Sequence, residues 1–184
     1  MMGLKLDGIS AESVRQQSEA IKEAIFSSEW YHKSSSISVY VSTKGEVETD
    51  EIIKGALRDG KMVFIPRFEK GCKVMEMLRL KDEDELHNLS TDLWDIRQPK
   101  FLDEAKRFQE YGPLNVVLTP GVSFTKSGDR LGHGKGFYDR FFEEHHVKFG
   151  HMPFLVGLAL KEQLVGEVPT ERTDVRLNLV LHSE

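Results

Sequence analysis

The sequence contains one cysteine, Cys72, so it cannot form an intramolecular disulfide and offers no cysteine-based metal cluster. Long apolar runs are also missing. No stretch approaches the roughly 20 residues that a membrane helix requires, and the first ten residues lack the basic start and apolar run of a signal peptide. Positive charge is in deficit, because 25 Lys and Arg face 30 Asp and Glu and leave a formal net charge of -5. These absences disfavour membrane and nucleic-acid partners and predict a cytoplasmic protein in a reducing compartment.

The composition is that of a globular protein with one core. Hydrophobic residues make up 39% and charged residues 30% of the 184-residue chain, which is long enough to bury a sizeable apolar interior. No internal repeat, low-complexity segment or linker divides it. We therefore expect residues 1–184 to form a single domain that acts as a monomer.

Hydrophobic periodicity alternates between strand and helix along the chain. Strands are predicted at residues 36–41, 62–65, 74–80, 115–119, 154–160 and 178–182. Helices are predicted at residues 10–30, 51–58, 102–109 and from 137 onward, with a helical turn at 161–164. Residues 62–65 are a short apolar run that we expect Pro66 to end, as in a buried parallel strand. The alternation predicts an α/β domain in which helices cover both faces of a mostly parallel sheet, a Rossmann-like three-layer arrangement.

In such sheets ligands bind at the carboxyl ends of the strands. The loops after Val41, Ile65 and Thr119 are therefore expected to converge on one cleft. The last of these loops is rich in glycine, and its glycines share one expected property, a positive φ angle that lets backbone N–H groups approach a ligand closely. They are Gly128, Gly132, Gly134 and Gly136.

The glycine loop also carries fixed charge. Arg130 and Lys135 add positive charge, and a helix after Gly136 would point its N-terminus into the loop, which suits a phosphate. Asp139, in the first turn of that helix, can cap it or hold a metal. The spacing matches neither the P-loop, which needs Ser or Thr where Phe137 stands, nor the dinucleotide pattern Gly-x-Gly-x-x-Gly. A mobile surface loop is the alternative interpretation, but the interleaved cations favour an anion site.

The sequence also resembles that of a known protein family. Residues 120–124 (PGVSF) and 128–140 (GDRLGHGKGFYDR) are similar to the signature of the 5-formyltetrahydrofolate cyclo-ligases, also called methenyltetrahydrofolate synthetases. Further segments follow in the order that this family has them: residues 9–12, 17–18, 45–53, 64–67, 94–96, 161–163 and 168–174. The resemblance covers nearly the whole chain, and the glycine motif with its flanks is highly specific.

The resemblance implies an ATP- and Mg²⁺-dependent reaction that converts 5-formyltetrahydrofolate into 5,10-methenyltetrahydrofolate and releases ADP and phosphate. The formyl oxygen takes the γ-phosphoryl group of ATP, N10 attacks the activated carbon, and phosphate leaves. Phosphoryl transfer asks mainly for positioning and charge neutralisation. A nucleophilic side chain is not needed, which agrees with the lack of a recognisable Ser/His/Asp or Cys/His set.

Carried over by position, the resemblance implies three sets of site residues. The ATP phosphate loop is Arg130, Leu131, Gly132, His133, Gly134, Lys135, Gly136, Phe137 and Tyr138, of which Arg130, Lys135 and Tyr138 are the expected catalytic residues. Magnesium is expected at Asp139 and Asp174, since carboxylate oxygens suit that hard cation. The folate is expected along Val41, Glu46, Trp94, His133 and Phe137, with Glu46 accepting hydrogen bonds from the pterin N–H groups.

Several side chains also have a purely structural interpretation. Trp94 is also interpretable as a satellite core aromatic, Glu46 as a surface carboxylate, and Asp174 as the cap of a turn. Met75 and Met77 are expected in the core. A histidine metal cluster is not expected, because residues 137–151 contain no His-x-x-x-His pair.

Three departures separate this chain from the family pattern. The N-terminal helix of the family carries a Lys and an Arg, four residues apart, that reach the ATP phosphates and the substrate; here the alignable sequence begins after them, and Lys5 matches neither. If each such donor is worth roughly 3 kcal/mol in the transition state, their loss would lower the rate by several powers of ten. His133 replaces an arginine that is common in relatives, so a titratable group stands in place of a fixed cation. Asn178 stands where relatives usually have Asp, which would remove a third acidic group near the metal.

Two other functions remain as hypotheses. The first is a non-catalytic or weakly active folate-binding protein that lacks the basic N-terminal residues. The second is a sugar-phosphate isomerase or related enzyme on the same sheet architecture, which would need a carboxylate base at the phosphate loop.

Overall fold

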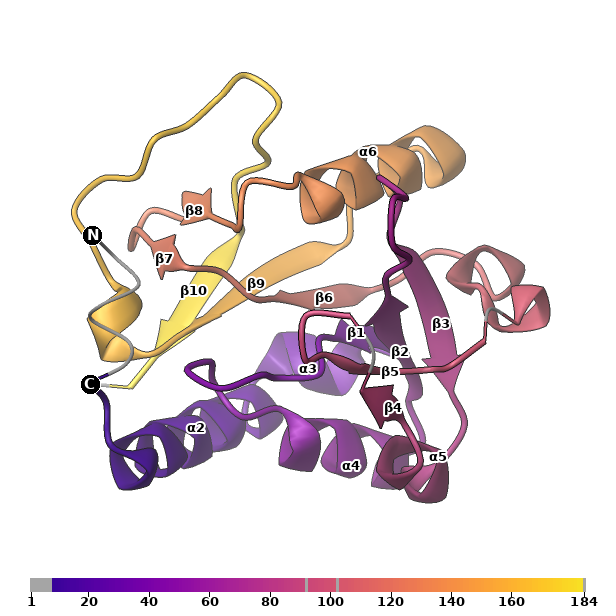
Figure 1. Cartoon of the computed structure of the whole chain (residues 1–184), viewed down its shortest axis with the longest axis horizontal. Coiled ribbons are helices and arrows are strands. Elements are labelled where there is room, and N and C mark those ends of the chain that lie inside the picture. Colours follow the sequence, from indigo (N-terminus) through magenta and orange to yellow (C-terminus); the bar gives the residue numbers. More distant parts are fainter. Residues whose placement is uncertain (1–7, 92, 102, 184) are drawn as a thin grey trace.

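A six-stranded sheet forms the centre of the computed structural model, which describes residues 8–91, 93–101 and 103–183 (Figure 1). The strand order is β10-β9-β6-β1-β2-β3. The strands are β1 (Ser36–Val39), β2 (Met62–Arg67), β3 (Glu76–Leu80), β6 (Val116–Thr119), β9 (Phe154–Ala159) and β10 (Leu179–His182). Every neighbouring pair is parallel except β2 and β3, which run antiparallel. The predicted mostly parallel sheet is therefore confirmed.

Helices cover both faces of this sheet, as the α/β prediction requires (Figure 1). One face carries α2 (Ala11–Phe26), α3 (Glu29–Lys33) and α4 (Asp50–Arg58), and the other carries α6 (Phe137–Phe149). The short α5 (Glu83–His87) follows β3. The single helix expected at residues 10–30 is in fact two helices. Ser28 interrupts it, because its hydroxyl accepts a hydrogen bond from the Tyr31 N–H at 3.4 Å and so starts α3 as an N-cap.

Each face of the sheet buries its own apolar cluster. Ile37 and Val63 pack in the cluster with α2 and α4, whereas Phe64 packs in the cluster with α6. All four residues of β1 and of β6 are buried, as in a parallel strand that is covered on both sides. Met75 and Met77 are 2% and 0% exposed in the α6-side cluster, so their predicted place in the core is confirmed.

The expectation that Pro66 ends its strand is wrong. β2 continues through Pro66 to Arg67 and pairs there with β3, Pro66 lying opposite Met77. The pairing of β2 with β1 ends earlier, at Phe64. Pro66 therefore lies where β2 has a partner on one side only, and a residue without an N–H group is tolerated at such a position.

The region between β3 and β6 is the least regular, as expected. It contains a small sheet of β4 (Ser90–Thr91) and β5 (Arg97–Gln98) and two 3-10 turns, η1 (Glu104–Lys106) and η2 (Phe108–Glu110). These turns replace the helix predicted at residues 102–109, whose first residue lies outside the described residues. Within residues 8–91, 93–101 and 103–183, none of the helices is long and apolar enough to cross a membrane.

One ionisable side chain is built into the α6-side core. His145 is 0% exposed, and its ring stacks on Phe108 at 5.8 Å between centroids. Its Nε2 accepts a hydrogen bond from the Leu114 N–H at 3.0 Å, so the proton is on Nδ1, which donates to the carbonyl of His151 at 3.0 Å. Burial lowers the pKa of His145 below its ordinary value. The hydrogen bond to the His151 carbonyl opposes this effect, and the imidazoles of His151 and His146 add to it.

The buried imidazole predicts how stability depends on pH. Because the unfolded chain binds this proton more tightly than the folded chain does, the contribution of His145 is fully present above the ordinary histidine pKa of about 6.5 and is lost as pH falls below it. Urea unfolding at a series of pH values should therefore show a smaller loss of unfolding free energy below about pH 6.5 in His145→Gln than in the wild type. The exposed His32 provides the control, His32→Gln. Equal slopes in His145→Gln and the wild type would contradict the assignment.

Candidate active site

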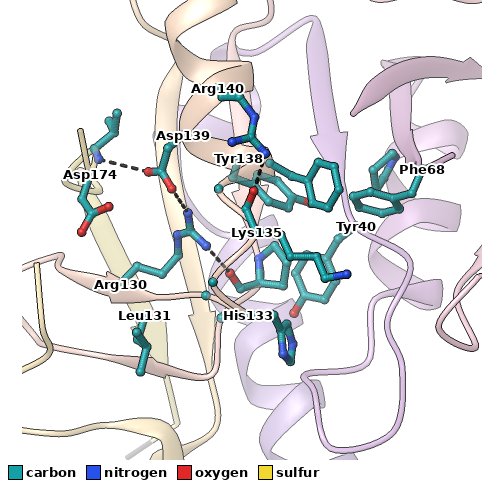
Figure 2. A pocket seen from close by; sticks show the side chains of 18 of the residues that line it. Tyr40, Phe68, Arg130, Leu131, His133, Lys135, Tyr138, Asp139, Arg140 and Asp174 are labelled. Carbon is teal, nitrogen blue, oxygen red and sulfur yellow. Dashed lines mark hydrogen bonds and ion pairs between the residues drawn. The ribbon is translucent and has the colours of Figure 1, made fainter. Parts of the chain in front are cut away.

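A cavity of about 1090 Å³ opens at the carboxyl edge of the sheet (Figure 2). Its walls include Val41 after β1, Phe68 after β2 and Pro120 after β6. The predicted convergence of these three loops is therefore confirmed. A further wall is the loop 169–175 that leads toward β10.

The glycine loop begins as a small hairpin of β7 (Ser123–Phe124) and β8 (Arg130–Leu131). Gly128, Gly134 and Gly136 have φ angles of 101°, 75° and 63°, as expected. The same expectation is wrong for Gly132, whose φ is not positive. What position 132 requires is space, because a Cβ there would lie 2.9 Å from Nη1 of Arg130.

The N-terminus of α6 presents free backbone donors to the cavity. Gly136 is its N-cap residue and provides no side-chain hydrogen bond. None of the N–H groups of residues 132–139 donates to an acceptor in the described part of the chain, and the first helical bond runs from the Arg140 N–H to the Gly136 carbonyl at 3.1 Å. Residues 130–139 all line the cavity. Such a run of unsatisfied amides at a helix N-terminus is a ready site for an anion.

Arg130 is almost fully enclosed, with 7% of its side chain exposed. It forms an ion pair with Asp139 at 3.3 Å, and its Nη1 donates to the carbonyl of Pro120 at 3.5 Å. Its Nε is buried without a partner among the described residues. The guanidinium therefore keeps donor capacity for a ligand in the cavity.

The hydroxyl of Tyr138 is a second unsatisfied donor. Tyr138 is 7% exposed and lines the cavity, and its Oη is buried without a hydrogen-bond partner among the described residues. Burial raises the pKa of this phenol, an effect that the nearby Arg130 opposes, so Tyr138 stays protonated at neutral pH. Arg130 lies 5.5 Å from the centre of the Tyr138 ring. The two donors therefore belong to one site.

The two expected magnesium ligands lie on the same side of the pocket (Figure 2). Besides the ion pair with Arg130, Asp139 accepts a hydrogen bond from the Val175 N–H at 3.1 Å. It makes no capping bond at the start of α6. Asp174 accepts from the Glu171 N–H at 2.7 Å, so the interpretation of this carboxylate as a turn cap holds, although Asp174 also lines the cavity.

Three aromatic rings form another wall. Phe68, Trp94 and Phe137 contact one another with centroids 5.1 to 6.0 Å apart. Trp94 is 45% exposed, which excludes the satellite-core interpretation, and its φ of 55° is unusual for a residue other than glycine. The ammonium group of Lys135 lies 3.9 Å from the centre of the Trp94 ring. The indole thereby holds a cation beside the aromatic wall.

Glu46 lies in the cavity rather than on the open surface. Its Oε2 accepts hydrogen bonds from the Thr43 N–H at 2.8 Å and from the Thr43 hydroxyl at 3.1 Å. Burial raises the pKa of the Glu46 carboxyl, while these hydrogen bonds and the nearby His133 oppose the rise. His133 is exposed and lines the same cavity.

The structure changes the interpretation of Asn178. This residue precedes β10, at the amino edge of the parallel strands and away from the cavity. Its Oδ1 accepts from the Leu155 N–H at 2.7 Å, and its own N–H donates to the Leu155 carbonyl at 2.9 Å. The interpretation of Asn178 as the loss of an acidic group near the metal is therefore wrong, because this position has a structural role. The departure at Lys5 lies outside the described residues. No group of three or more His, Cys, Asp or Glu in the described ranges is arranged to hold a metal.

Sequence reasoning missed several residues of the cavity. Tyr40 and Phe68 are 3% and 8% exposed and line it from the ends of β1 and β2. Tyr40 lies near the end of the strand predicted at residues 36–41, and Phe68 follows the one predicted at 62–65 by three residues, so the carboxyl ends of predicted strands were the available signal. Arg140 and Arg172 also line it. Both lie in segments that carry the family resemblance, residues 128–140 and 168–174, and that placement was the available signal.

Comparison with known proteins places the chain in a family. A family model described as the 5-formyltetrahydrofolate cyclo-ligase family matches residues 3–183. A probable 5-formyltetrahydrofolate cyclo-ligase of Caenorhabditis elegans is 48% identical over 178 residues, which cover 96% of this chain and 86% of the relative. The 5-formyltetrahydrofolate cyclo-ligase of Mus musculus is 33% identical over 180 residues, covering 98% and 89%.

Solved structures show the same fold at lower identity. An NMR structure of the 5,10-methenyltetrahydrofolate synthetase of Aquifex aeolicus is similar with a TM-score of 0.72 and 22% identity, covering 97% of this chain and 84% of the other. The corresponding protein of Mycoplasma pneumoniae has a TM-score of 0.69 and 17% identity, covering 100% and 94%. Since the family model spans almost the entire sequence, the chain belongs to the 5-formyltetrahydrofolate cyclo-ligase family, a family of ligases.

Proposed function

We propose that this chain closes 5-formyltetrahydrofolate to 5,10-methenyltetrahydrofolate in the cavity at the carboxyl edge of the sheet, with ATP as phosphoryl donor and Mg²⁺ as the metal. Family membership supports the overall reaction. The observation that supports ATP most directly is the run of N–H groups at residues 132–139 that have no acceptor among the described residues and that line one cavity with Arg130 and Lys135. All of these groups come from one chain, so the proposal is for a catalytic monomer.

The donor set fits a nucleotide triphosphate. Backbone amides and the positive end of α6 would hold the phosphate oxygens, and Arg130 and Lys135 would neutralise their charge. ATP, when bound, supplies the phosphoryl group that turns the formyl oxygen into a leaving group. The phosphate loop proposed here is the whole segment from Arg130 to Tyr138.

The carboxylates fit a magnesium ion that is bound mainly through the nucleotide. Mg²⁺ usually takes one or two carboxylates together with phosphate oxygens and water. Asp139 and Asp174 would supply the two carboxylates. The Val175 N–H, which donates to Asp139 at 3.1 Å, would keep that carboxylate oriented.

The opposite part of the cavity fits the folate. Phe137 and Trp94 would pack on its rings, and Val41 would give the apolar contact at the end of β1. Glu46 would accept hydrogen bonds from the pterin through Oε1, because Thr43 occupies Oε2. His133 lines the same region of the cavity.

In this proposal the side chains of the cavity position the reactants and neutralise their charge, and they form no covalent bond with the substrate. Arg130 would stabilise the negative charge that develops on the transferred phosphoryl group, and its buried Nε is available for this contact. Tyr138 would donate its hydroxyl hydrogen to an oxygen of the reacting group. The aromatic wall of Phe68, Trp94 and Phe137 would exclude water from the activated formyl carbon.

The decisive experiment mixes the purified protein with 5-formyltetrahydrofolate and Mg-ATP and follows the absorbance of the methenyl product. Formation of the product with ATP, and none without it, is the expected result. In Arg130→Gln, kcat should fall about 100- to 1000-fold, as when one transition-state donor is removed. Arg58→Gln, an exposed arginine on α4, is the matched control and should behave as the wild type.

Two outcomes would contradict the proposal. Folate binding by calorimetry without any turnover would favour a binding protein. Turnover of a sugar phosphate without ATP would favour the isomerase hypothesis.

Tyr138→Phe separates catalysis from stability. The substitution removes a hydroxyl that has no partner within the described structure, so the free energy of unfolding should stay equal or rise slightly. If the hydroxyl donates to a charged oxygen of the reacting group, kcat should fall about 10- to 100-fold. Steady-state kinetics and urea unfolding of the same preparation measure both quantities. An unchanged kcat would remove Tyr138 from the catalytic set.

A further inference from the structure

Arg140 connects two segments that are far apart in the sequence. It lies in the first turns of α6, is exposed, and has no role in the reaction as proposed above. Its Nε donates to the carbonyl of Lys73 at 2.8 Å, and its Nη2 donates to the carbonyl of Lys135. Figure 2 shows the guanidinium directed at the end of the glycine loop. The side chain also lies against the Phe137 ring, 5.6 Å from its centre.

The two carbonyls belong to different segments of the chain. Lys135 is part of the glycine loop that lines the cavity, whereas Lys73 belongs to the neighbouring exposed segment 69–74 between β2 and β3. A guanidinium is planar and offers several N–H donors in a fixed fork, so it can serve two acceptors at once. An ammonium group is a single point donor on a flexible stem and would not reproduce both bonds in this geometry.

The bond to Lys135 also determines where a phosphate-binding amide points. In a trans peptide the C=O and the following N–H point in opposite directions. Because Arg140 holds the Lys135 carbonyl, the Gly136 N–H must point away from Arg140. A Cβ at position 136 would lie 3.1 Å from Nη1 of Arg140, so the guanidinium occupies the space that this glycine leaves open.

We propose that Arg140 is a positioning residue that clamps the Lys135–Gly136 peptide to the 69–74 segment and presets the glycine loop for nucleotide. This inference rests on the proposed function of the same cavity. Arg140 acts through the loop and need not touch ATP, because Nε and Nη2 are both engaged by carbonyls. Without the clamp, nucleotide binding would have to order the loop first, and that cost lowers affinity.

The experiment compares the full-length wild type with Arg140→Lys and Arg140→Gln. Calorimetry should show an ATP Kd that rises about 10-fold in both variants, whereas the folate Kd changes less than about 2-fold. Limited trypsin digestion of the ligand-free protein should show faster cleavage after Lys73 and Lys135. Cleavage after the exposed Lys126, on the other side of the loop, should keep its rate.

Arg58→Lys is the matched control and should change none of these quantities. Faster cleavage at every site would mean general destabilisation and would overturn the proposal. Weaker ATP binding with unchanged cleavage after Lys73 and Lys135 would mean that Arg140 contacts the nucleotide directly, and would overturn it as well. If the wild type binds ATP but forms no methenyl product, the proposed function is wrong. The digestion experiment still shows in that case whether Arg140 clamps the loop.

Discussion

The ion pair between Arg130 and Asp139 is the contact on which the site depends. It joins β8 to the first turn of α6, and the second oxygen of Asp139 receives the Val175 N–H. One carboxylate thus connects three segments that approach the cavity separately. With 7% of the Arg130 side chain exposed, loss of either partner would leave a nearly buried charge uncompensated, which is costly. Because the pair anchors both ends of the glycine loop, the amides between them need not bond to one another.

Several polar groups of this cavity have no hydrogen-bond partner within the described part of the chain. The amides of residues 132–139, the Nε of Arg130 and the hydroxyl of Tyr138 all lack partners among the described residues. The two buried groups among them, the Nε of Arg130 and the hydroxyl of Tyr138, lower the stability of the folded chain, and a ligand that satisfied both would recover that loss on binding. A chain organised for stability alone would not retain such an arrangement. The parallel sheet makes it possible, since its carboxyl edge gathers loops from β1, β2 and β6 around a rigid support.

Predictions from the sequence were correct where short patterns of neighbouring residues determine the structure. The apolar runs identified every strand of the central sheet, and the glycine loop with its following helix lies where the spacing predicts. The predictions were wrong where the local structure depends on a contact with another strand or side chain. Pro66 stays in its strand because β1 no longer pairs with β2 at that point. Gly132 is required for the space that Arg130 takes up rather than for its φ angle. Ser28 separates two helices because its hydroxyl caps the second of them.

Taken by itself, the sequence determined the α/β class, the order of the elements, the position of the glycine loop and of the helix after it and, through the resemblance, the family. These follow from periodicity, residue type and spacing, all of which act over a few neighbouring residues. Only the tertiary structure decided that Asn178 lies at the amino edge, that the Tyr138 hydroxyl has no partner among the described residues and that Arg140 reaches Lys73. Such contacts join residues tens of positions apart, and their geometry is set by how strands and helices pack, a constraint that no local pattern of side chains contains.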